Sequence, residues 1–361
     1  MTDFDFTGNS PQFPLKKTPK YLGTTGNGQL DQTILQLCDS IPSVDNENAL
    51  AEMMITAVKL ARGGATPGDF KMLNRALKEM REANEVFDKY NHRRKVAVFG
   101  SARTPQEHPE YQTAKDFSAK MAELGYMTIT GAGPGIMAAG NEGAGKDESF
   151  GLDITLPFEA SANEYILGDE KLIEFNYFFT RKLSFVKEAH AAVACPGGVG
   201  TMDEIFEAMT LIQTGKAMVY PLILLNAPGS DYWKKWDDFV RSALMEGNYI
   251  SKTDFHLWKI TDSVDEAVKE IETFYSNFNS YRYIGDTLII RIKHAPSTKE
   301  LAKFNEDFAD IIKEGQMEVC EPLKGERECL EMPRITFQHK RRDYGRLRLL
   351  IDAINQISTV E

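Results

Sequence analysis

The sequence predicts an α/β protein whose core is a Rossmann-like parallel sheet with helices on both faces. Short apolar runs alternate with helical patterns from residue 95 onwards, which is typical of strand–helix–strand units. Before this region the apolar residues follow a helical spacing, and after residue 281 a short βαββα pattern appears. We therefore expect an α-helical N-terminal part (residues 1–92), a Rossmann-like domain (residues 93–280) and a small α+β module (residues 281–361).

The N-terminal part is expected to be helical after an extended arm. Residues 1–28 are rich in Gly, Pro, Thr and Asn, which favours a poorly ordered arm. Apolar residues spaced three and four apart then predict a short helix around residues 34–38 and longer helices over residues 49–61 and 69–90.

Five apolar runs predict the strands of the central sheet, at residues 95–100, 126–130, 152–157, 191–195 and 218–225. A helical stripe over residues 111–124 connects the first two and ends at Gly125, a typical C-terminal cap. In parallel sheets of this kind ligands bind beyond the carboxyl ends of the strands. The loops after the first, second and fourth strands are therefore the places to search for a site.

The C-terminal module is predicted from a shorter series of patterns. A strand over residues 287–293 and a helix over 298–312 come first. Strands follow at residues 316–320 and 335–338, and a helix over 344–357 completes the βαββα order. A module of this length lies within the normal range for small domains.

Composition excludes several classes of protein. The 361 residues include 42 Lys and Arg against 53 Asp and Glu, a net charge of −11, so a nucleic-acid partner is disfavoured. The N-terminus is acidic where a secretory signal is basic, and the longest apolar runs are too short to cross a membrane. We therefore expect a cytoplasmic protein with no membrane partner. No metal site is expected either, because the four cysteines lack the spacing of a zinc site or a disulfide scaffold: Cys38, Cys195, Cys320 and Cys329.

The strongest local signal is the segment PGGVGTMDE (residues 196–204), directly after the fourth predicted strand. Its glycines allow a ligand to approach the backbone, and a helix that begins near Thr201 offers free N–H groups and a positive dipole end to an anion. We expect Gly197, Gly198, Gly200 and Thr201 to bind such a group. The segment matches neither a Walker A loop nor a GxGxxG fingerprint, and a tight turn without a ligand explains it equally well by itself.

Two further loops favour a ligand. Ser101 follows the first strand in GSAR, and Gly133 and Gly135 follow the second in GAGPG. Both loops are expected at the same edge of the sheet as the PGGVGT segment. Three glycine-bearing loops at three strand ends are hard to explain as turns alone. The sequence therefore predicts a site for a phosphorylated small molecule.

Charged side chains accompany this site. Glu204 and Glu207, three residues apart, share one side of the predicted helix with Thr201, where they need a cation or a polar ligand between them. Upstream, Arg181 and Lys182 begin another helix, although its dipole favours acids there. They are either surface residues, or Arg181 reaches the site and pairs with Glu204 or with the substrate.

The Arg-Lys pair followed by PGGxGTxxE resembles the Lonely Guy (LOG) family of nucleoside 5′-monophosphate phosphoribohydrolases, long mislabelled as lysine decarboxylases. GAGPGIM, Gln213 and Gly215 support the resemblance, which covers residues 93–250. It implies a Rossmann-like homodimer or larger assembly that hydrolyses the N-glycosidic bond of AMP or a cytokinin riboside monophosphate. It assigns catalysis to Arg181 and Glu204. We also expect Lys182 and Glu207 to bind the substrate.

This chain departs from the family at Phe178, where a Met usually stands three residues before the Arg-Lys pair, and it adds long segments at both ends. These differences bear on which base is released, and not on the cleavage chemistry. A second interpretation is a non-catalytic carrier of a nucleotide or of the molybdenum cofactor, which has no need for Arg181 and Glu204 together. Pyridoxal-phosphate-dependent lysine decarboxylation is rejected because no motif supplies a Schiff-base lysine and a pyridinium partner. No cofactor is expected.

A basic cluster marks the C-terminal module. We expect this module to regulate or oligomerise the enzyme without taking part in bond cleavage. Its cations form either a solvated or intersubunit rim, or a site for an anionic effector. Between residues 334 and 348 there are six cations and one acid, Asp343. The cations are Arg334, Lys340, Arg341, Arg342, Arg346 and Arg348.

Overall fold

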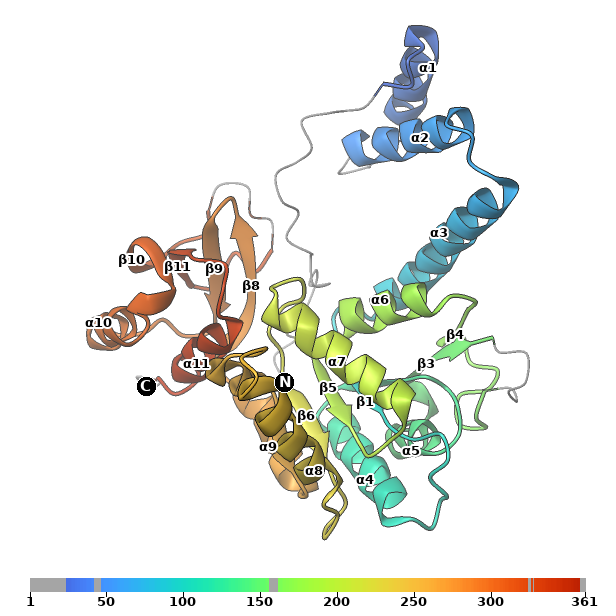
Figure 1. Cartoon of the computed structure of the whole chain (residues 1–361). Coiled ribbons are helices and arrows are strands. Elements are labelled where there is room, and N and C mark those ends of the chain that lie inside the picture. Colours follow the sequence, from blue (N-terminus) through green and yellow to red (C-terminus); the bar gives the residue numbers. More distant parts are fainter. Residues whose placement is uncertain (1–23, 42–46, 156–161, 324–325, 327, 358–361) are drawn as a thin grey trace. The chain divides into compact units, whose positions relative to one another are not determined.

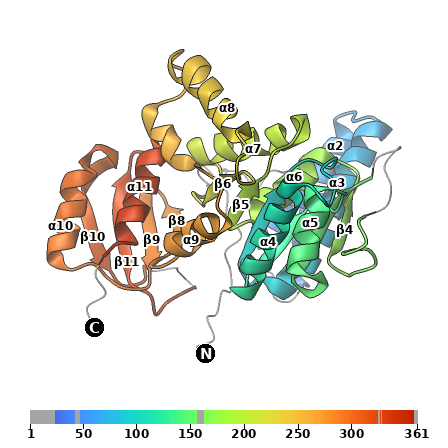
Figure 2. The same cartoon turned by 90° about the horizontal axis from the view of Figure 1, so that it is seen from below.

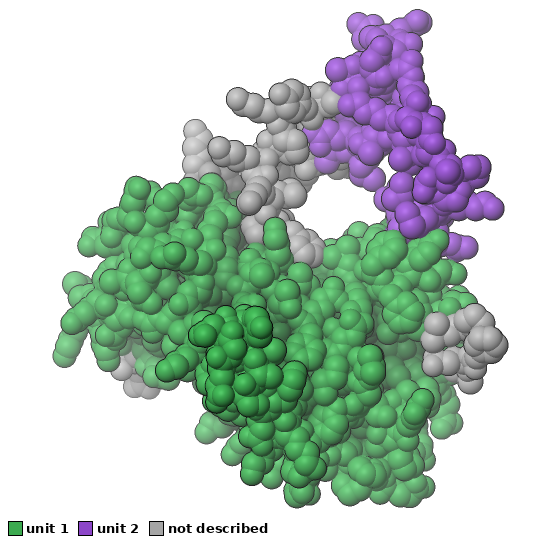
Figure 3. All heavy atoms as spheres, viewed as in Figure 1, with its two compact units in different colours: residues 1–14, 80–361 green, residues 15–79 purple. Residues whose placement is uncertain are grey.

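The computed structural model describes residues 24–41, 47–155, 162–323, 326 and 328–357. The chain divides into two compact units, residues 15–79 and a larger one that spans residues 80–361 with residues 1–14 (Figure 3). The predicted arm lies outside the described residues up to residue 23. The boundaries expected after residues 92 and 280 remain predictions. None of the described helices combines the length and the apolar composition that crossing a membrane requires.

The smaller unit consists of helices, as the apolar spacing predicts. α1 (Gly28–Asp39) begins at Asn27, whose side chain accepts hydrogen bonds from the backbone N–H groups of Gln29 and Leu30. α2 (Glu47–Arg62) packs against it, and the first part of α3 (Pro67–Phe87) follows. The small apolar core between α1 and α2 consists of four buried residues: Ile34, Cys38, Ala51 and Ile55.

A parallel sheet forms the centre of the larger unit. In the described part of the chain its strands number seven, in the order β4-β3-β2-β1-β5-β6-β7, and every neighbouring pair is parallel. The strands are β1 (Lys95–Phe99), β2 (Met127–Thr130), β3 (Ser149–Ile154), β4 (Leu172–Phe175), β5 (Ala191–Ala194), β6 (Leu222–Leu225) and β7 (Lys259–Thr261). The predicted fold class is confirmed.

Helices cover both faces of this sheet (Figures 1 and 2). α4 (Pro109–Glu123), α5 (Ile136–Ala144) and α9 (Val264–Phe274) lie on one face. α6 (Phe178–Glu188), α7 (Val199–Gln213) and α8 (Tyr232–Phe239) lie on the other. The short helical turns are η1 (Asp88–Tyr90), η2 (Lys146–Glu148), η3 (Val240–Met245), η4 (Lys252–Leu257) and η5 (Ala309–Ile311).

The strand order reverses between β1 and β5. From β1 the chain adds β2, β3 and β4 on one side, and then crosses to β5, β6 and β7 on the other. The loops after β1 and β5 therefore diverge to opposite faces and leave a crevice at the carboxyl ends of these strands. The GSAR and PGGVGT segments stand on either side of this crevice.

The C-terminal module contains a second, antiparallel sheet with two helices. Its described strands follow the order β10-β11-β9-β8. One strand more than predicted is present, because β8 pairs with β9 across a turn at Gly285 and Asp286. The elements are β8 (Phe278–Ile284), β9 (Thr287–Ile292), α10 (Thr298–Asp307), β10 (Ile312–Cys320), β11 (Arg334–His339) and α11 (Tyr344–Ile354).

The two sheets share one apolar core. Buried residues of β6, such as Ile223, belong to the same cluster as Ile290 of β9 and Leu347 of α11. Polar contacts add to it, since the backbone N–H of Val219 donates to the hydroxyl of Tyr281 at 3.0 Å. The C-terminal module is therefore fastened to the parallel sheet by burial as well as by the chain connection.

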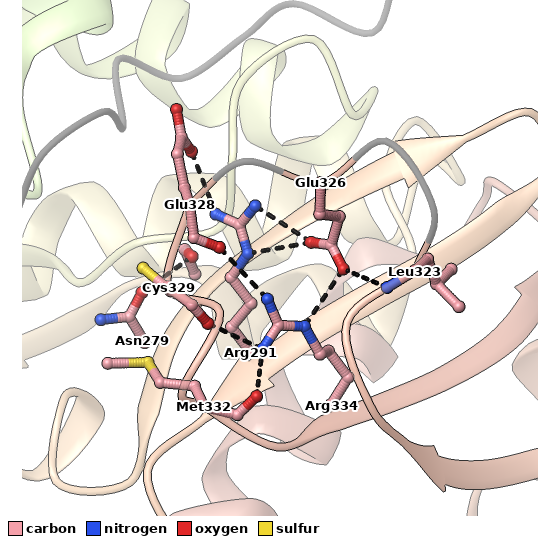
Figure 4. A network of polar contacts seen from close by, with 9 residues as sticks. Asn279, Arg291, Leu323, Glu326, Glu328, Cys329, Met332 and Arg334 are labelled. Carbon is pink, nitrogen blue, oxygen red and sulfur yellow. Dashed lines mark hydrogen bonds and ion pairs between the residues drawn. The ribbon is translucent and has the colours of Figure 1, made fainter.

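A buried ionic network lies inside the C-terminal module (Figure 4). Arg291 of β9 and Arg334 of β11 stand directly opposite each other, and both side chains are at most 1% exposed. The carboxylate of Glu326 joins them, at 3.1 Å from each guanidinium, and also accepts from the backbone N–H of Leu323 at 2.9 Å. Glu328 adds a contact of 3.3 Å to Arg291. One carboxylate thus offsets two like charges that would otherwise repel each other.

We expect Glu326→Gln to lower the free energy of unfolding by about 3–5 kcal/mol, because it removes the carboxylate that joins the two buried guanidinium groups, while Glu328 still contacts Arg291. Urea unfolding measures this loss. Burial raises the pKa of Glu326, but the Leu323 N–H and both arginines hold it below its ordinary value of 4.5. The stabilisation is therefore present above pH 4.5 and is lost as the pH falls through the lowered, folded-state pKa. Glu328→Gln is the matched control. An equal loss in both variants contradicts this account.

Candidate active site

Three loops meet at the carboxyl edge of the parallel sheet, and Ser101 lies between the other two. Its backbone N–H donates to the carbonyl of Pro196 at 3.1 Å, and its carbonyl accepts from the N–H of Ile136 at 3.0 Å. The loop after β1 is thus tied to the PGGVGT segment on one side and to the start of α5 on the other. The convergence expected from the sequence is present in the structure.

Glycine is required where these loops touch. Gly135 has a φ of +66°, and a Cβ there would overlap the carbonyl of Ser101. At Gly197 a Cβ would overlap the side chain of Thr201, and at Gly133 it would lie 2.7 Å from the terminal carbon of Met137. These contacts give Gly133, Gly135 and Gly197 a packing role in addition to any ligand contact.

The GAGPG loop is held in a strained shape by buried amides. Ala132 is fully buried with a φ of +61°, a conformation that a residue with a side chain adopts only at a cost. The Asn163 amide donates to the carbonyls of Ala132 and Gly133 at 2.9 and 3.0 Å. Asn141 accepts both from this amide and from the hydroxyl of Thr130. This network fixes the loop before any ligand binds.

The N-terminus of α7 is open to solvent. The helix begins after Gly198, at which no capping side-chain hydrogen bond forms among the described residues. Gly198 and Gly200 are exposed, Val199 is 87% exposed and Thr201 is buried. Tyr232 of α8 donates to the carbonyl of Gly197 at 2.5 Å and so fixes the segment that leads into the helix. Uncapped N–H groups and the helix dipole make this end suitable for an anion.

Lys182 joins α6 to α7. Its ammonium lies 2.7 Å from carboxylate oxygens of both Asp203 and Glu207, and its side chain is only 12% exposed. Burial lowers the pKa of Lys182, but the hydrogen bonds to these two carboxylates raise it overall. Lys182 was predicted to bind substrate, and in the structure its charge is engaged by the protein. The sequence analysis asked for a cation or a polar ligand between Glu204 and Glu207, and in the structure Lys182 pairs with Glu207 and with Asp203.

Glu204 lies between Asp203 and Glu207 on α7 and is half-buried. Burial raises the pKa of Glu204 to about 7, against the effect of Lys182 and Arg181 and with a further contribution from Glu207. A carboxyl group with such a pKa exchanges its proton near neutral pH. This behaviour suits a group that alternates between acid and base.

Arg181 reaches the edge of the sheet. Its guanidinium carbon lies 5.5 Å from the ring centre of Phe178 and 5.9 Å from that of Phe185. One of its terminal nitrogens lies 3.8 Å from the place that a Cβ would take at Gly131, which directly follows β2. Arg181 is therefore near the GAGPG loop, and it affects the pKa of Glu204. Its catalytic role remains a prediction.

Several residues of the site were not predicted. Asp203 lies within the PGGVGTMDE motif, but the sequence analysis gave it no role of its own. Its position directly before Glu204 could have indicated one. Asn163 and Tyr232 come from distant segments, and nothing in their local sequence marks them. Within the described residues no group of His, Cys, Asp and Glu gathers in a way that could hold a metal ion.

The basic cluster of the C-terminal module is largely engaged within the chain. Arg346 contacts both carboxylate oxygens of Asp310 at 2.7 and 2.8 Å, and Arg348 pairs with Glu270 and Asp352. Lys340 donates to the carbonyl of Asp310, and Arg341 contacts Gly285 and Asp286. Arg334 belongs to the buried network. An anionic effector at this cluster remains a prediction.

Comparison with known proteins agrees with this geometry. Residues 135–271 match a family model described as "Possible lysine decarboxylase". Over 94 residues the chain is 36% identical to the cytokinin riboside 5′-monophosphate phosphoribohydrolase LOG1 of Arabidopsis thaliana. This region is similar to LOG-family proteins. The resemblance stated from the Arg-Lys pair and the PGGxGTxxE motif is confirmed.

The LOG-family match covers only part of each protein. It spans 26% of this chain and 42% of the Arabidopsis relative. The pyrimidine/purine nucleotide 5′-monophosphate nucleosidase of Escherichia coli K12 is 34% identical over 148 residues, 38% of this chain and 32% of its own length. The chain thus spans less than half of either relative. The molybdenum cofactor binding protein of Rippkaea orientalis is similar in structure at a TM-score of 0.37, with 19% identity, over 50% of this chain and 96% of its own.

We expect Lys182→Met to raise the pKa of Glu204 above its value of about 7, because Lys182 is a cation that lowers it. Titration of the ¹³C-labelled glutamate carboxyl groups by NMR, with Glu204→Gln to assign the signal, measures the change. Lys187→Met on the same helix is the matched control, since Lys187 pairs with Glu188 instead. A lowered or unchanged Glu204 pKa in Lys182→Met contradicts this electrostatic account.

Proposed function

We propose that this chain hydrolyses the N-glycosidic bond of a nucleoside 5′-monophosphate and releases the free base and ribose 5-phosphate. The observation that carries the proposal is the position of Glu204, a carboxyl group with a pKa of about 7, beside the uncapped N-terminus of α7. The LOG-family relatives support the same chemistry, since their names describe phosphoribohydrolases and nucleosidases of nucleoside monophosphates.

The 5′-phosphate binds at the N-terminus of α7 in this proposal. The N–H groups around Gly198, Gly200 and Thr201 face no capping side chain in the described part of the chain, and they offer the dipole end that anions prefer. Ser101 and the GAGPG loop complete the surroundings of the sugar. Binding of the phosphate, which does not react, then places the glycosidic bond beside Glu204.

Glu204 assists departure of the base. As the bond to the base breaks, positive charge develops on the ribose, and a nearby carboxylate stabilises this charge. The base leaves with the electron pair of the broken bond. Water adds to the anomeric carbon and gives up a proton to Glu204, and this proton then passes to the departing base. Arg181 lies close enough to influence Glu204 and supplies positive charge for the phosphate or for the departing base.

The second candidate is a carrier that binds a nucleotide or a cofactor without cleaving it. A carrier needs the loops around Ser101 and Gly197 but gains nothing from a carboxyl group with a raised pKa beside them. The composition of the site therefore favours the hydrolase. We further propose that the enzyme is cytoplasmic and forms a homodimer or a larger assembly, as the family resemblance implies.

We expect AMP or a related purine monophosphate to be cleaved at least about a hundred times faster than the corresponding nucleoside, measured as kcat/KM, because the phosphate provides the positioning energy. Incubation with a panel of nucleoside monophosphates, followed by chromatography of free base and ribose 5-phosphate, measures this. Equal turnover of AMP and adenosine contradicts the proposed phosphate site. Tight binding with no turnover of any member of the panel favours the carrier.

We expect Glu204→Gln and Arg181→Ala each to lower kcat by about a hundredfold or more, the scale for loss of one preorganised charged group. Because the carboxylate is the active form, kcat of the wild type rises as the pH increases through about 7. The Glu204→Gln variant loses this rise. Glu123→Gln, on the exposed face of α4, is the control and keeps full activity. Near-normal kcat in both active-site variants refutes the assigned roles.

A further inference from the structure

The C-terminal end of the α7 helix is in contact with the C-terminal module. The helix ends at Gln213, and Gly215 follows with a φ of +66°. The N–H of Gly215 donates to the carbonyl of Ile212 at 3.0 Å, and that of Lys216 to the carbonyl of Leu211 at 2.7 Å. This pair of bonds is the Schellman arrangement, and it fixes the direction in which the chain leaves the helix.

Tyr344 occupies the space that a side chain at Gly215 would need. A Cβ at Gly215 would overlap both the hydroxyl oxygen and the adjoining ring carbon of Tyr344. Tyr344 is the first residue of α11, is 4% exposed and makes an edge-on contact with His339 at 5.5 Å between ring centres. The end of the tyrosine side chain thus packs directly against the backbone of Gly215, and closely packed atoms of this kind resist displacement.

A second contact holds the same end of α7. Gln213, its last residue, donates to the carboxylate of Asp254 in η4 at 2.7 Å. Beside Tyr344, Gly345 is pressed against η4 so closely that a Cβ would overlap the carbonyl of Thr253. Residues 344 and 345 therefore determine where η4 and the end of α7 lie with respect to each other.

The anchoring of α11 is rigid. Arg348, which is buried, pairs with Glu270 of α9 and with Asp352 one turn further along α11. Asp343 accepts from the N–H of Arg346 and caps the helix. Tyr344 is thus carried by an element that is fixed to both the small sheet and the parallel sheet.

We propose that Tyr344 is a positioning residue for the active site, which sets the position of α7 along its axis and thereby the position of Glu204. The inference rests on the proposed function. Glu204 lies nine residues before Gln213, the last residue of α7, which is about 14 Å along the helix, and a hydrogen-bonded helix transmits a displacement of one end to the other. The module that was expected to take no part in bond cleavage therefore contributes to the geometry of the site.

The test uses four variants of the full chain and measures kcat and KM for the best nucleoside monophosphate. Gly215→Ala forces Tyr344 or α7 to move, and we expect kcat to fall about tenfold or more with KM changed less than about twofold. Tyr344→Ala removes the ring that blocks movement of α7 along its axis, and it lowers kcat in the same way. Tyr344→Phe keeps the ring and stays within about twofold of the wild type. The double variant Gly215→Ala/Tyr344→Ala has no overlap to relieve, so we expect its kcat to match that of Tyr344→Ala and the two losses not to multiply.

Two further measurements separate position from stability. Phe304→Ala empties a buried site on α10, the other helix of the module. It lowers the free energy of unfolding and leaves kcat unchanged. The pKa of Glu204, followed by carboxyl NMR, falls from about 7 towards its ordinary value in Gly215→Ala, because a displaced α7 admits water.

The outcomes are distinguishable. Folded Gly215→Ala and Tyr344→Ala proteins with the kcat and the Glu204 titration of the wild type overturn the positioning role. If the wild type cleaves no monophosphate, the proposed function fails, and the Glu204 titration still decides whether Tyr344 positions α7. If Gly215→Ala does not fold while the double variant does, the overlap with Tyr344 is supported, and the kcat of Tyr344→Ala decides the effect on the site.

Discussion

The ion pairs of Lys182 determine the arrangement on which the candidate site depends. One buried ammonium satisfies Asp203 and Glu207 at 2.7 Å each and so connects α6 to α7 above the parallel sheet. Without it, three carboxyl groups would stand together within little more than one turn of helix. Lys182 offsets part of the charge of the outer two, and burial is the largest influence on the middle one, Glu204, whose pKa it raises to about 7. The raised pKa of Glu204 is thus a consequence first of its burial and then of the charges around it.

The glycine-bearing loops serve two physical purposes at once. Gly135 and Gly197 allow the three loops to touch, since a Cβ at Gly135 would overlap the carbonyl of Ser101 and a Cβ at Gly197 would lie 3.0 Å from the backbone nitrogen of Ser101. The same closeness leaves the N–H groups at the start of α7 facing solvent, where they attract an anion. The strained Ala132 and the amide of Asn163 make one of these loops rigid in advance. A site built in this way loses little conformational entropy when its ligand binds.

The sequence predicts most of the fold because the central strands are fully buried and therefore form continuous apolar runs. β4 and β7 were missed since they lie at the edges of the sheet, where Glu174 is exposed and Lys259 is half-exposed. The face shared by Thr201, Glu204 and Glu207 follows from helical periodicity. Helical periodicity does not predict the partners of Lys182, because α6 and α7 are separated by β5 in the chain and meet only through tertiary packing. For the same reason nothing in the local sequence connects Tyr344 with Gly215.

The two ends of α7 are held by different kinds of interaction, and this difference matters for how the module and the domain act together. At the first half of the helix the charges of Lys182, Asp203 and Glu207 fix its rotation, because the carboxylates must face α6. Ion pairs of flexible side chains still allow sliding along the axis. At the far end, Tyr344 against the backbone of Gly215 resists sliding, since close-packed atoms cannot interpenetrate. Rotation set by charge and translation set by packing together fix a rigid helix. In our proposal the appended module therefore contributes to the position of Glu204 through the far end of α7, where Tyr344 meets Gly215.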